Sequence, residues 1–149
     1  MESNFKIVGY ETSQGEFKLQ RTSSELEALM SNIFGKMNPR VAKFGKVTNT
    51  SVRKITLEDG TKKYFLFADE VREDQVSTIA IGLSTDMEGN ILLDDGKICN
   101  HRCTKTLISG CIGQCDMTIL EECKRLMCSC RQGEGSCESE IIITYTDDK

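Results

Sequence analysis

The chain has 149 residues, a formal net charge of −4, and 38% hydrophobic and 28% charged residues. This composition is typical of a globular protein and argues against a long disordered or low-complexity chain. No apolar run approaches the roughly 18 residues that a membrane-spanning helix requires, so we expect no membrane span. Residues 1–4 carry an acid, Glu2, and lack the apolar segment of a secretory signal peptide, so we see no signal peptide; the chain could still be a form from which such a signal was removed.

Short runs of β-forming residues predict several strands. Turn-forming residues separate three consecutive pairs of these runs: Ser-Gln-Gly, Glu-Asp-Gly-Thr and Glu-Gly-Asn. Such turns between β-prone segments indicate antiparallel hairpins, and the Asp-Gly step is the strongest of the three signals. The expected strands cover residues 5–10, 16–20, 52–57, 62–67, 76–85, 91–93 and 141–145.

One segment has the pattern of an amphipathic helix. Ser24 and Glu27 fit a capping box, and Thr22 and Glu25 offer the same pattern two residues earlier. Gly35 is a natural residue for the C-terminal end of the helix. Apolar residues at helical spacing should form its buried face, namely Leu26, Leu29, Met30, Ile33 and Phe34.

The order of these elements predicts an α+β fold. One helix would pack on a curled antiparallel sheet, and a small, cysteine-rich, partly helical insertion would precede the last strand. We therefore divide the chain into an α+β domain (1–95), a cysteine-rich module (96–138), and a final strand with a tail (139–149) that rejoins the first domain. The continuous apolar run at 141–145 predicts that the last strand is buried on both faces.

All the cysteines of the chain lie in the module, and the first 98 residues contain none. Residues four apart share a helix face, so the two CxxxC units predict short helices that each present two sulfurs to one side. A third helix, capped by Thr118 and Glu121, would run to about Met127. The CxxxC units resemble those of helical-hairpin proteins stapled by twin disulfides. We infer no function for this chain from that resemblance. The cysteines are Cys99, Cys103, Cys111, Cys115, Cys123, Cys128, Cys130 and Cys137.

Two chemistries fit this set of cysteines. Four disulfides would stabilise a module with few large apolar residues, each by about 2–4 kcal/mol, and eight cysteines allow 105 pairings among which the sequence does not choose. Alternatively, the same cysteines would form two four-thiolate zinc sites, or a site of three thiolates and His101. The absence of any CxxC pair makes the zinc hypothesis the weaker one, and no resident cofactor is expected under the disulfide hypothesis.

The remaining motifs point away from catalysis and from nucleic acid. The sequence contains no Walker loop, HExxH, GxSxG or GxGxxG motif, so we expect no enzyme, although the sequence does not decide this. His101 is expected at the solvated surface. Residues 36–65 carry eight basic and two acidic side chains, which we interpret as the outward faces of strands. Residues 66–149 carry eight basic and sixteen acidic side chains, an unfavourable balance for binding phosphates.

These observations predict a non-enzymatic binding protein of the secreted or cell-envelope class, with a disulfide-stapled module and a protein or peptide partner. One alternative is a cytoplasmic zinc-binding adaptor whose module is folded by metal. Another is a precursor that releases a cysteine-rich C-terminal peptide. The sequence does not identify the ligand or the oligomeric state.

Overall fold

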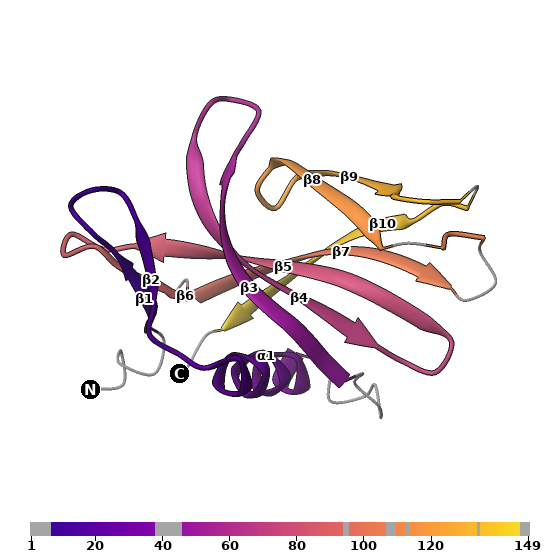
Figure 1. The fold of residues 1–149 in the computed structure, drawn as a ribbon, viewed down its shortest axis with the longest axis horizontal. Coiled ribbons are helices and arrows are strands. Elements are labelled where there is room, and N and C mark those ends of the chain that lie inside the picture. The colour runs from indigo at the N-terminus through magenta and orange to yellow at the C-terminus, as the bar shows by residue number, and fades with distance from the viewer. Residues whose placement is uncertain are drawn as a thin grey trace.

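A computed structural model describes residues 7–37, 46–93, 96–106, 110–112, 114–133 and 135–146. Within these ranges the chain forms ten strands and one helix (Figure 1). In chain order they are β1 (Ile7–Glu11), β2 (Phe17–Leu19), α1 (Ser23–Met37), β3 (Lys46–Thr56), β4 (Lys62–Val71), β5 (Gln75–Thr85), β6 (Asn90–Leu93), β7 (Gly96–Thr106), β8 (Cys115–Glu121), β9 (Arg125–Cys130) and β10 (Glu138–Thr146).

Eight of the strands form one antiparallel sheet, which is strongly curved and barrel-like. The long strand β5 is its centre, because β4 pairs with one edge of β5 while β7 and β6 pair with the other. β3 pairs with the outer edge of β4, and β10 pairs with the outer edge of β7. β8 and β9 form a separate two-stranded hairpin.

The predicted α+β class is wrong: the described part of the protein is mostly β, with a single helix. Of the expected helices of the cysteine module, the one at Cys99–Cys103 is part of strand β7, and the segment from Thr118 to Met127 forms most of the β8–β9 hairpin. At the second CxxxC unit, Cys111 forms an isolated bridge and Cys115 begins β8. The error has a physical cause. Residues four apart share a face in a strand, where side chains alternate, as well as in a helix, so CxxxC spacing does not distinguish the two.

The sheet is covered on both sides (Figure 1). We call the side that contacts α1 the helix face and the side under the β8–β9 hairpin the hairpin face. Alternation along β4 sends Leu66 and Ala68 to the helix face, and Phe65 and Phe67 to the hairpin face. Because both faces are covered, seven consecutive residues of β4 are buried, from Tyr64 to Glu70.

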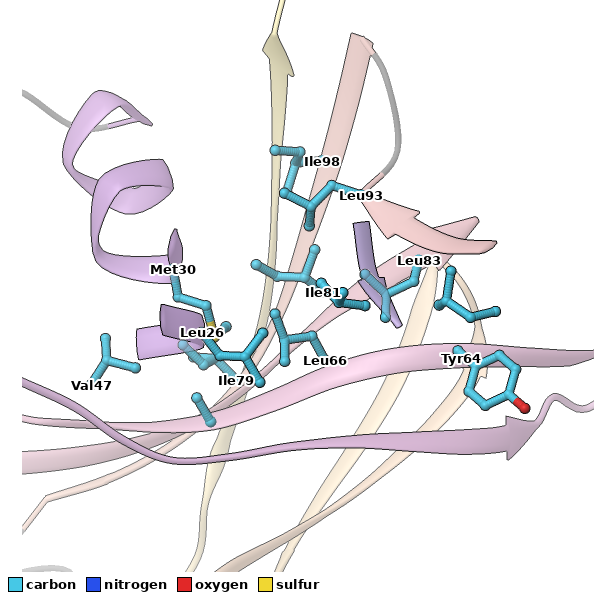
Figure 2. Close-up of a cluster of buried hydrophobic side chains, with 13 residues drawn as sticks. Leu26, Met30, Val47, Tyr64, Leu66, Ile79, Ile81, Leu83, Leu93 and Ile98 are labelled. Carbon is cyan, nitrogen blue, oxygen red and sulfur yellow. The ribbon is translucent and has the colours of Figure 1, made fainter. Parts of the chain in front are cut away.

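The largest apolar cluster lies on the helix face (Figure 2). Leu26 and Met30 of α1 are fully buried there against strand residues such as Ile79 and Ile81. The capping box that begins the helix is the earlier of the two candidates, since the Glu25 N–H donates to the Thr22 hydroxyl and the Thr22 N–H donates to the Glu25 carboxylate. The side chains of Ile33 and Phe34 lie outside the described residues.

The expected end of the helix at Gly35 is wrong, because α1 continues to Met37. A glycine inside a helix costs only about 1 kcal/mol relative to alanine, so it permits a helix end without imposing one. The three predicted hairpins are present, as β1–β2, β3–β4 and β5–β6. Gly60 has a φ of 91° at the Asp-Gly turn between β3 and β4, a conformation that favours glycine.

A buried ionic network interrupts the apolar helix face at one end of β4, β5 and β7. Glu70 is fully buried and accepts hydrogen bonds from Arg102 and from Arg72. Arg102 also donates to the Ser77 hydroxyl, which in turn lies 2.7 Å from the hydroxyl of Thr104. The carboxylate is therefore matched by two guanidinium groups, as a buried charge requires.

β10 returns to the sheet by pairing with β7 over nine residues. It lies at the sheet edge, and the expectation that both its faces are buried is wrong: Ile141 and Ile142 are half-buried, and Ile143 is 41% exposed. β7 carries Cys99 and Cys103, so the cysteines begin inside the main sheet. The predicted boundaries at residues 96 and 138 therefore do not separate β7 from the sheet, and whether residues 96–138 unfold independently of the first domain stays a prediction.

Candidate binding site at the disulfide-stapled hairpin

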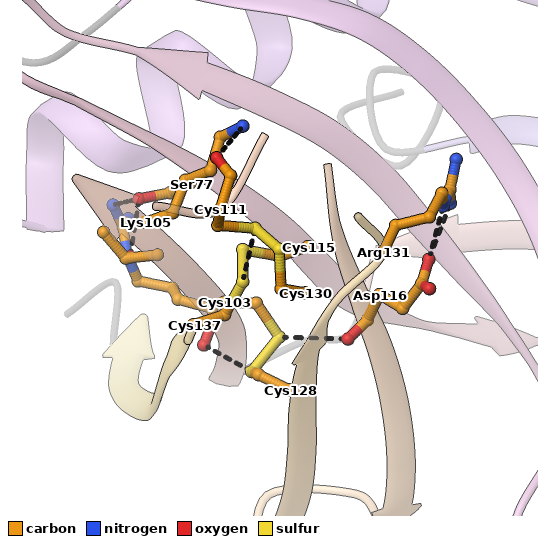
Figure 3. Close-up of a disulfide and its surroundings, with 12 residues drawn as sticks. Ser77, Cys103, Lys105, Cys111, Cys115, Asp116, Cys128, Cys130, Arg131 and Cys137 are labelled. Carbon is orange, nitrogen blue, oxygen red and sulfur yellow. Dashed lines mark hydrogen bonds and ion pairs between the residues drawn. A yellow bond between two sulfur atoms is a disulfide. The ribbon is translucent and has the colours of Figure 1, made fainter. Parts of the chain in front are cut away.

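Four disulfides involve all eight cysteines and attach the β8–β9 hairpin and the segments around it to the sheet. Figure 3 shows those of Cys103, Cys111 and Cys115. Two of them start on β7, and the other two lie at the base of the hairpin. The pairs are Cys99–Cys123, Cys103–Cys128, Cys111–Cys130 and Cys115–Cys137. The prediction of a disulfide-stapled module is therefore confirmed in this structure.

The strand structure explains how these cysteines meet. Cys99 and Cys103 lie on the same face of β7 and point to the hairpin, while the residues that alternate with them on β7 point to the helix face. Cys128 and Cys130 are two residues apart and share the inner face of β9. That Cys-Ser-Cys spacing was a usable sequence signal for a strand, because residues two apart point in very different directions on a helix.

His101 is fully buried between the sheet and the hairpin, so its expected place at the solvated surface is wrong. Its Nδ1 lies 3.0 Å from the carbonyl oxygen of Ala80, and the N–H of Cys123 donates to its Nε2 over 3.0 Å. Because the Cys123 N–H can only donate, Nε2 must accept and the proton resides on Nδ1. His101 is thus a neutral cross-link between β7, β5 and the hairpin turn.

Burial also sets the protonation behaviour of His101. Loss of hydration lowers the pKa of the imidazole, and the nearby Lys63 ammonium acts in the same direction. The Ala80 carbonyl and the Glu122 carboxylate oppose this shift but are weaker than the burial. With both nitrogens occupied, the ring has no lone pair left for a metal in the disulfide-bonded form.

A small apolar cluster lies beneath the hairpin. Ile119 of β8 is buried against Phe65, Phe67 and Ala80 of the sheet. Partly buried residues extend this contact from both sides: Ile55, Leu57, Met117 and Leu126. The inner face of the hairpin is therefore apolar between its sulfurs, and the outer face is left to solvent.

An ion pair anchors the tip of the hairpin. Glu122 accepts hydrogen bonds from the Lys63 ammonium at 2.7 and 2.8 Å, and the carboxylate lies directly over Gly82 of β5. A Cβ atom at Gly82 would lie 2.1 Å from Glu122 Oε2, so a side chain there would displace the carboxylate. At the same end, Arg125 pairs with Glu58 in the β3–β4 turn.

A polar pocket opens where β8 meets β3 and β4. Its volume is about 290 Å³. On its floor, the largely buried Asp69 accepts hydrogen bonds from the side-chain amides of Asn49 and Gln114. Asn49 belongs to a bulge in β3 and has a φ of 56°, so an irregularity in the strand creates this part of the wall.

Two arginines stand at the rim of this pocket. The Arg53 guanidinium lies 4.4 Å from the centroid of the Phe67 ring, and Arg131 is paired with Asp116 of β8 at 2.7 Å (Figure 3). The pocket thus offers a carboxylate at the bottom and guanidinium groups at the entrance. Together with the exposed outer face of the hairpin, where Met127 is 59% exposed, it forms what we call the seam surface.

Sequence reasoning found the cysteines of this site but not the seam surface. Arg53 was assigned to a solvated strand face, and Asp69 and Gln114 carried no local signal, because they are 45 residues apart and meet only through the tertiary fold. For the zinc hypothesis, the described residues contain a single group of three converging ligands, Cys111, Cys115 and Cys137, rather than two four-thiolate sites.

Within the described ranges, no helix is both long and apolar enough to cross a membrane. No protein-family model, curated protein or solved structure matches the chain, so the geometry of the stapled hairpin and its seam surface carries the functional argument.

Proposed function

We propose that the protein is a non-enzymatic, extracellular or cell-envelope binding protein, and that it recognises an extended segment of a protein partner through the seam surface. One observation carries this proposal: four disulfides and a buried histidine hold the hairpin rigidly on the sheet beside the pocket. A pre-organised surface loses little conformational entropy on binding, which favours affinity. Disulfides persist in oxidising compartments, which supports the location.

The chemistry of the pocket favours a peptide segment as the ligand. A peptide or side-chain amide offers both a donor and an acceptor. The donor would bind the Asp69 carboxylate, and the acceptor would bind the guanidinium of Arg53. A volume of about 290 Å³ is at the lower limit for small-molecule sites, so it suits one or two side chains of a larger partner.

The precursor hypothesis is disfavoured by the sheet. Release of the cysteine-rich part would remove β7 and β10, and β7 pairs along seven residues with the central strand β5. The zinc-adaptor hypothesis requires all the cysteines to be reduced, so the intact-mass measurement described next tests it.

Intact mass of the protein purified from its native host, without added oxidant, should be lower than that of the reduced chain by eight hydrogens. Eight titratable thiols in this material would contradict the proposal. Comparing the amount of the protein purified from the cells with the amount purified from the surrounding medium shows whether the protein is secreted.

The partner site is tested by photo-crosslinking. A benzophenone amino acid at Gln114 should capture a protein in the native host, whereas the same group at Ala28, exposed on α1, should not. The substitutions Arg53→Ala and Asp69→Asn should reduce capture from position 114. Equal capture from both positions, or capture that neither substitution affects, would contradict the seam surface as the binding site.

A further inference from the structure

Two of the four disulfides lie side by side at the base of the hairpin. The Sγ atoms of Cys111 and Cys137 belong to different disulfides but are only 3.8 Å apart (Figure 3). The Sγ atoms of Cys111, Cys115 and Cys137 all lie within 4.8 Å of one another, and the sulfur of Cys130 is bonded to that of Cys111. Three sulfurs therefore converge, and the fourth, that of Cys130, is attached to one of them without itself belonging to the group.

This arrangement has the dimensions of a metal site. Zinc–sulfur bonds of about 2.3 Å in a tetrahedron place neighbouring sulfurs about 3.8 Å apart. The gap between Cys111 and Cys137 already has that length. When the two disulfides are reduced, each bonded pair has to separate by about 2 Å, and the Cys130 sulfur has to move toward those of Cys115 and Cys137; side-chain rotation provides such movements.

In the folded protein, backbone contacts also place three of the four cysteines close together. Cys115 and Cys130 are directly paired in the β8–β9 register. Cys111 forms a bridge with Gly133, and the Ile112 N–H donates to the Gln132 carbonyl over 2.8 Å. Gly133 permits this approach, because its φ is 103° and a Cβ atom there would lie 2.4 Å from the Gly110 carbonyl oxygen.

The local charge also suits thiolates. The Lys105 ammonium donates to the carbonyl oxygens of Cys111 and Ile112, each over 3.3 Å, so a cation lies beside the sulfur cluster. A tetrathiolate zinc centre carries a net charge of −2, which a neighbouring cation stabilises. The other two disulfides lie outside this group, because none of their cysteines belongs to the described ligands that converge within 4.8 Å.

We propose that the reduced chain binds one zinc ion through the thiolates of Cys111, Cys115, Cys130 and Cys137, and that oxidation replaces this site by the two disulfides. In the oxidation, two small-molecule disulfides accept four electrons and become four thiolates. The four cysteine thiolates form two S–S bonds, and Zn²⁺ leaves. The zinc-bound form is thus a reduced-state alternative to the disulfide-bonded form, and it is independent of the seam surface.

The test uses the full chain, reduced with a phosphine under anaerobic conditions and titrated with Co²⁺. We expect one Co²⁺ per chain, with the intense visible absorption of tetrahedral thiolate coordination, and displacement of Co²⁺ by Zn²⁺. The double substitution Cys115→Ser, Cys137→Ser should weaken binding at least about hundredfold, since the metal site is then left with two thiolates. The matched control Cys99→Ser, Cys123→Ser removes one disulfide pair outside the group and should change affinity less than about threefold.

A second measurement needs no variant. Oxidation of the reduced chain by oxidised glutathione, followed by disulfide mapping, should give Cys99–Cys123 and Cys103–Cys128 first when Zn²⁺ is present. The proposal is overturned if the reduced chain binds no stoichiometric metal, if both double variants bind alike, or if Zn²⁺ delays all four disulfides equally.

Discussion

The two faces of the central sheet are stabilised in different ways. On the helix face, thirteen buried apolar residues form a continuous cluster with α1, and no cysteine takes part. On the hairpin face, the buried cluster has four residues, and four disulfides, a histidine cross-link and an ion pair hold the covering layer. The first face is a hydrophobic core, whereas the second is a cross-linked surface.

This difference teaches how a small β-hairpin can cover a sheet. A two-stranded hairpin is at best marginally stable alone, and the apolar area under β8 and β9 is too small to offset the entropy of ordering it. Cross-links restrict the unfolded chain and so remove much of that entropic cost. The stability of the hairpin should therefore depend on redox state, and that of the helix face should not.

The largest expected effect is that of reduction. Removing all four disulfides, each of which contributes about 2–4 kcal/mol, should unfold the β8–β9 hairpin while most of the main sheet stays folded. Hydrogen exchange of the reduced protein, with a chelator present, measures this. Ile79 and Ile81 of β5 should remain protected while residues 115–130 exchange rapidly. If both regions lose protection together, the predicted division into separate folding units is wrong.

The next largest effect concerns the helix face. Glu70→Gln leaves the Arg102 guanidinium largely buried without a carboxylate, and this should cost about 3–5 kcal/mol in the free energy of unfolding. Urea denaturation at constant redox state measures the loss. The double variant Glu70→Gln, Arg102→Met removes both charges and should recover most of the stability. A double variant as unstable as the single one would show that the charges are not the cause.

The pH dependence of the hairpin face follows from His101. Burial lowers the pKa of the folded-state imidazole below the unfolded value of about 6.5, so the folded state binds fewer protons. Its contribution to stability is complete above pH 6.5 and is lost as the pH falls from there through the folded-state pKa. Unfolding curves between pH 7.5 and 5 measure this slope, and His101→Gln, which cannot titrate, should flatten it. An unchanged slope in that variant would assign the pH dependence to other groups.

The smallest effect tests the ion pair at the hairpin tip. Gly82→Ala places a Cβ atom where the Glu122 carboxylate lies, so the contact with Lys63 should be lost at a cost of about 1 kcal/mol. The matched background is Glu122→Ala, in which the same glycine substitution should have almost no effect. A double-mutant cycle on thermal stability gives the coupling. Equal costs of Gly82→Ala in both backgrounds would show that the β5 backbone, and not the ion pair, requires glycine.

Much of the local structure was predictable from the sequence. The Asp-Gly turn between β3 and β4, the other hairpin turns and the helix with its buried Leu26 and Met30 follow from short-range patterns and are present in the structure. The helix end at Gly35 and the burial of the last strand were wrong, but the largest error lies in the cysteine module, where the CxxxC spacing predicted helices. That spacing fits both kinds of element, and only the pairing of β7 with β5 and β10 distinguishes them.

The sequence by itself determined that the cysteines are confined to one part of the chain, that the first half contains hairpins and an amphipathic helix, and that motifs of common enzymes are missing. Only the tertiary structure decided the pairing of the cysteines, the burial of His101 and the meeting of Asp69 with Gln114. The physical reason is the range of the interactions. Turns and helix caps depend on neighbouring residues, whereas sulfur pairs and pocket walls depend on the register between strands that are distant in the chain.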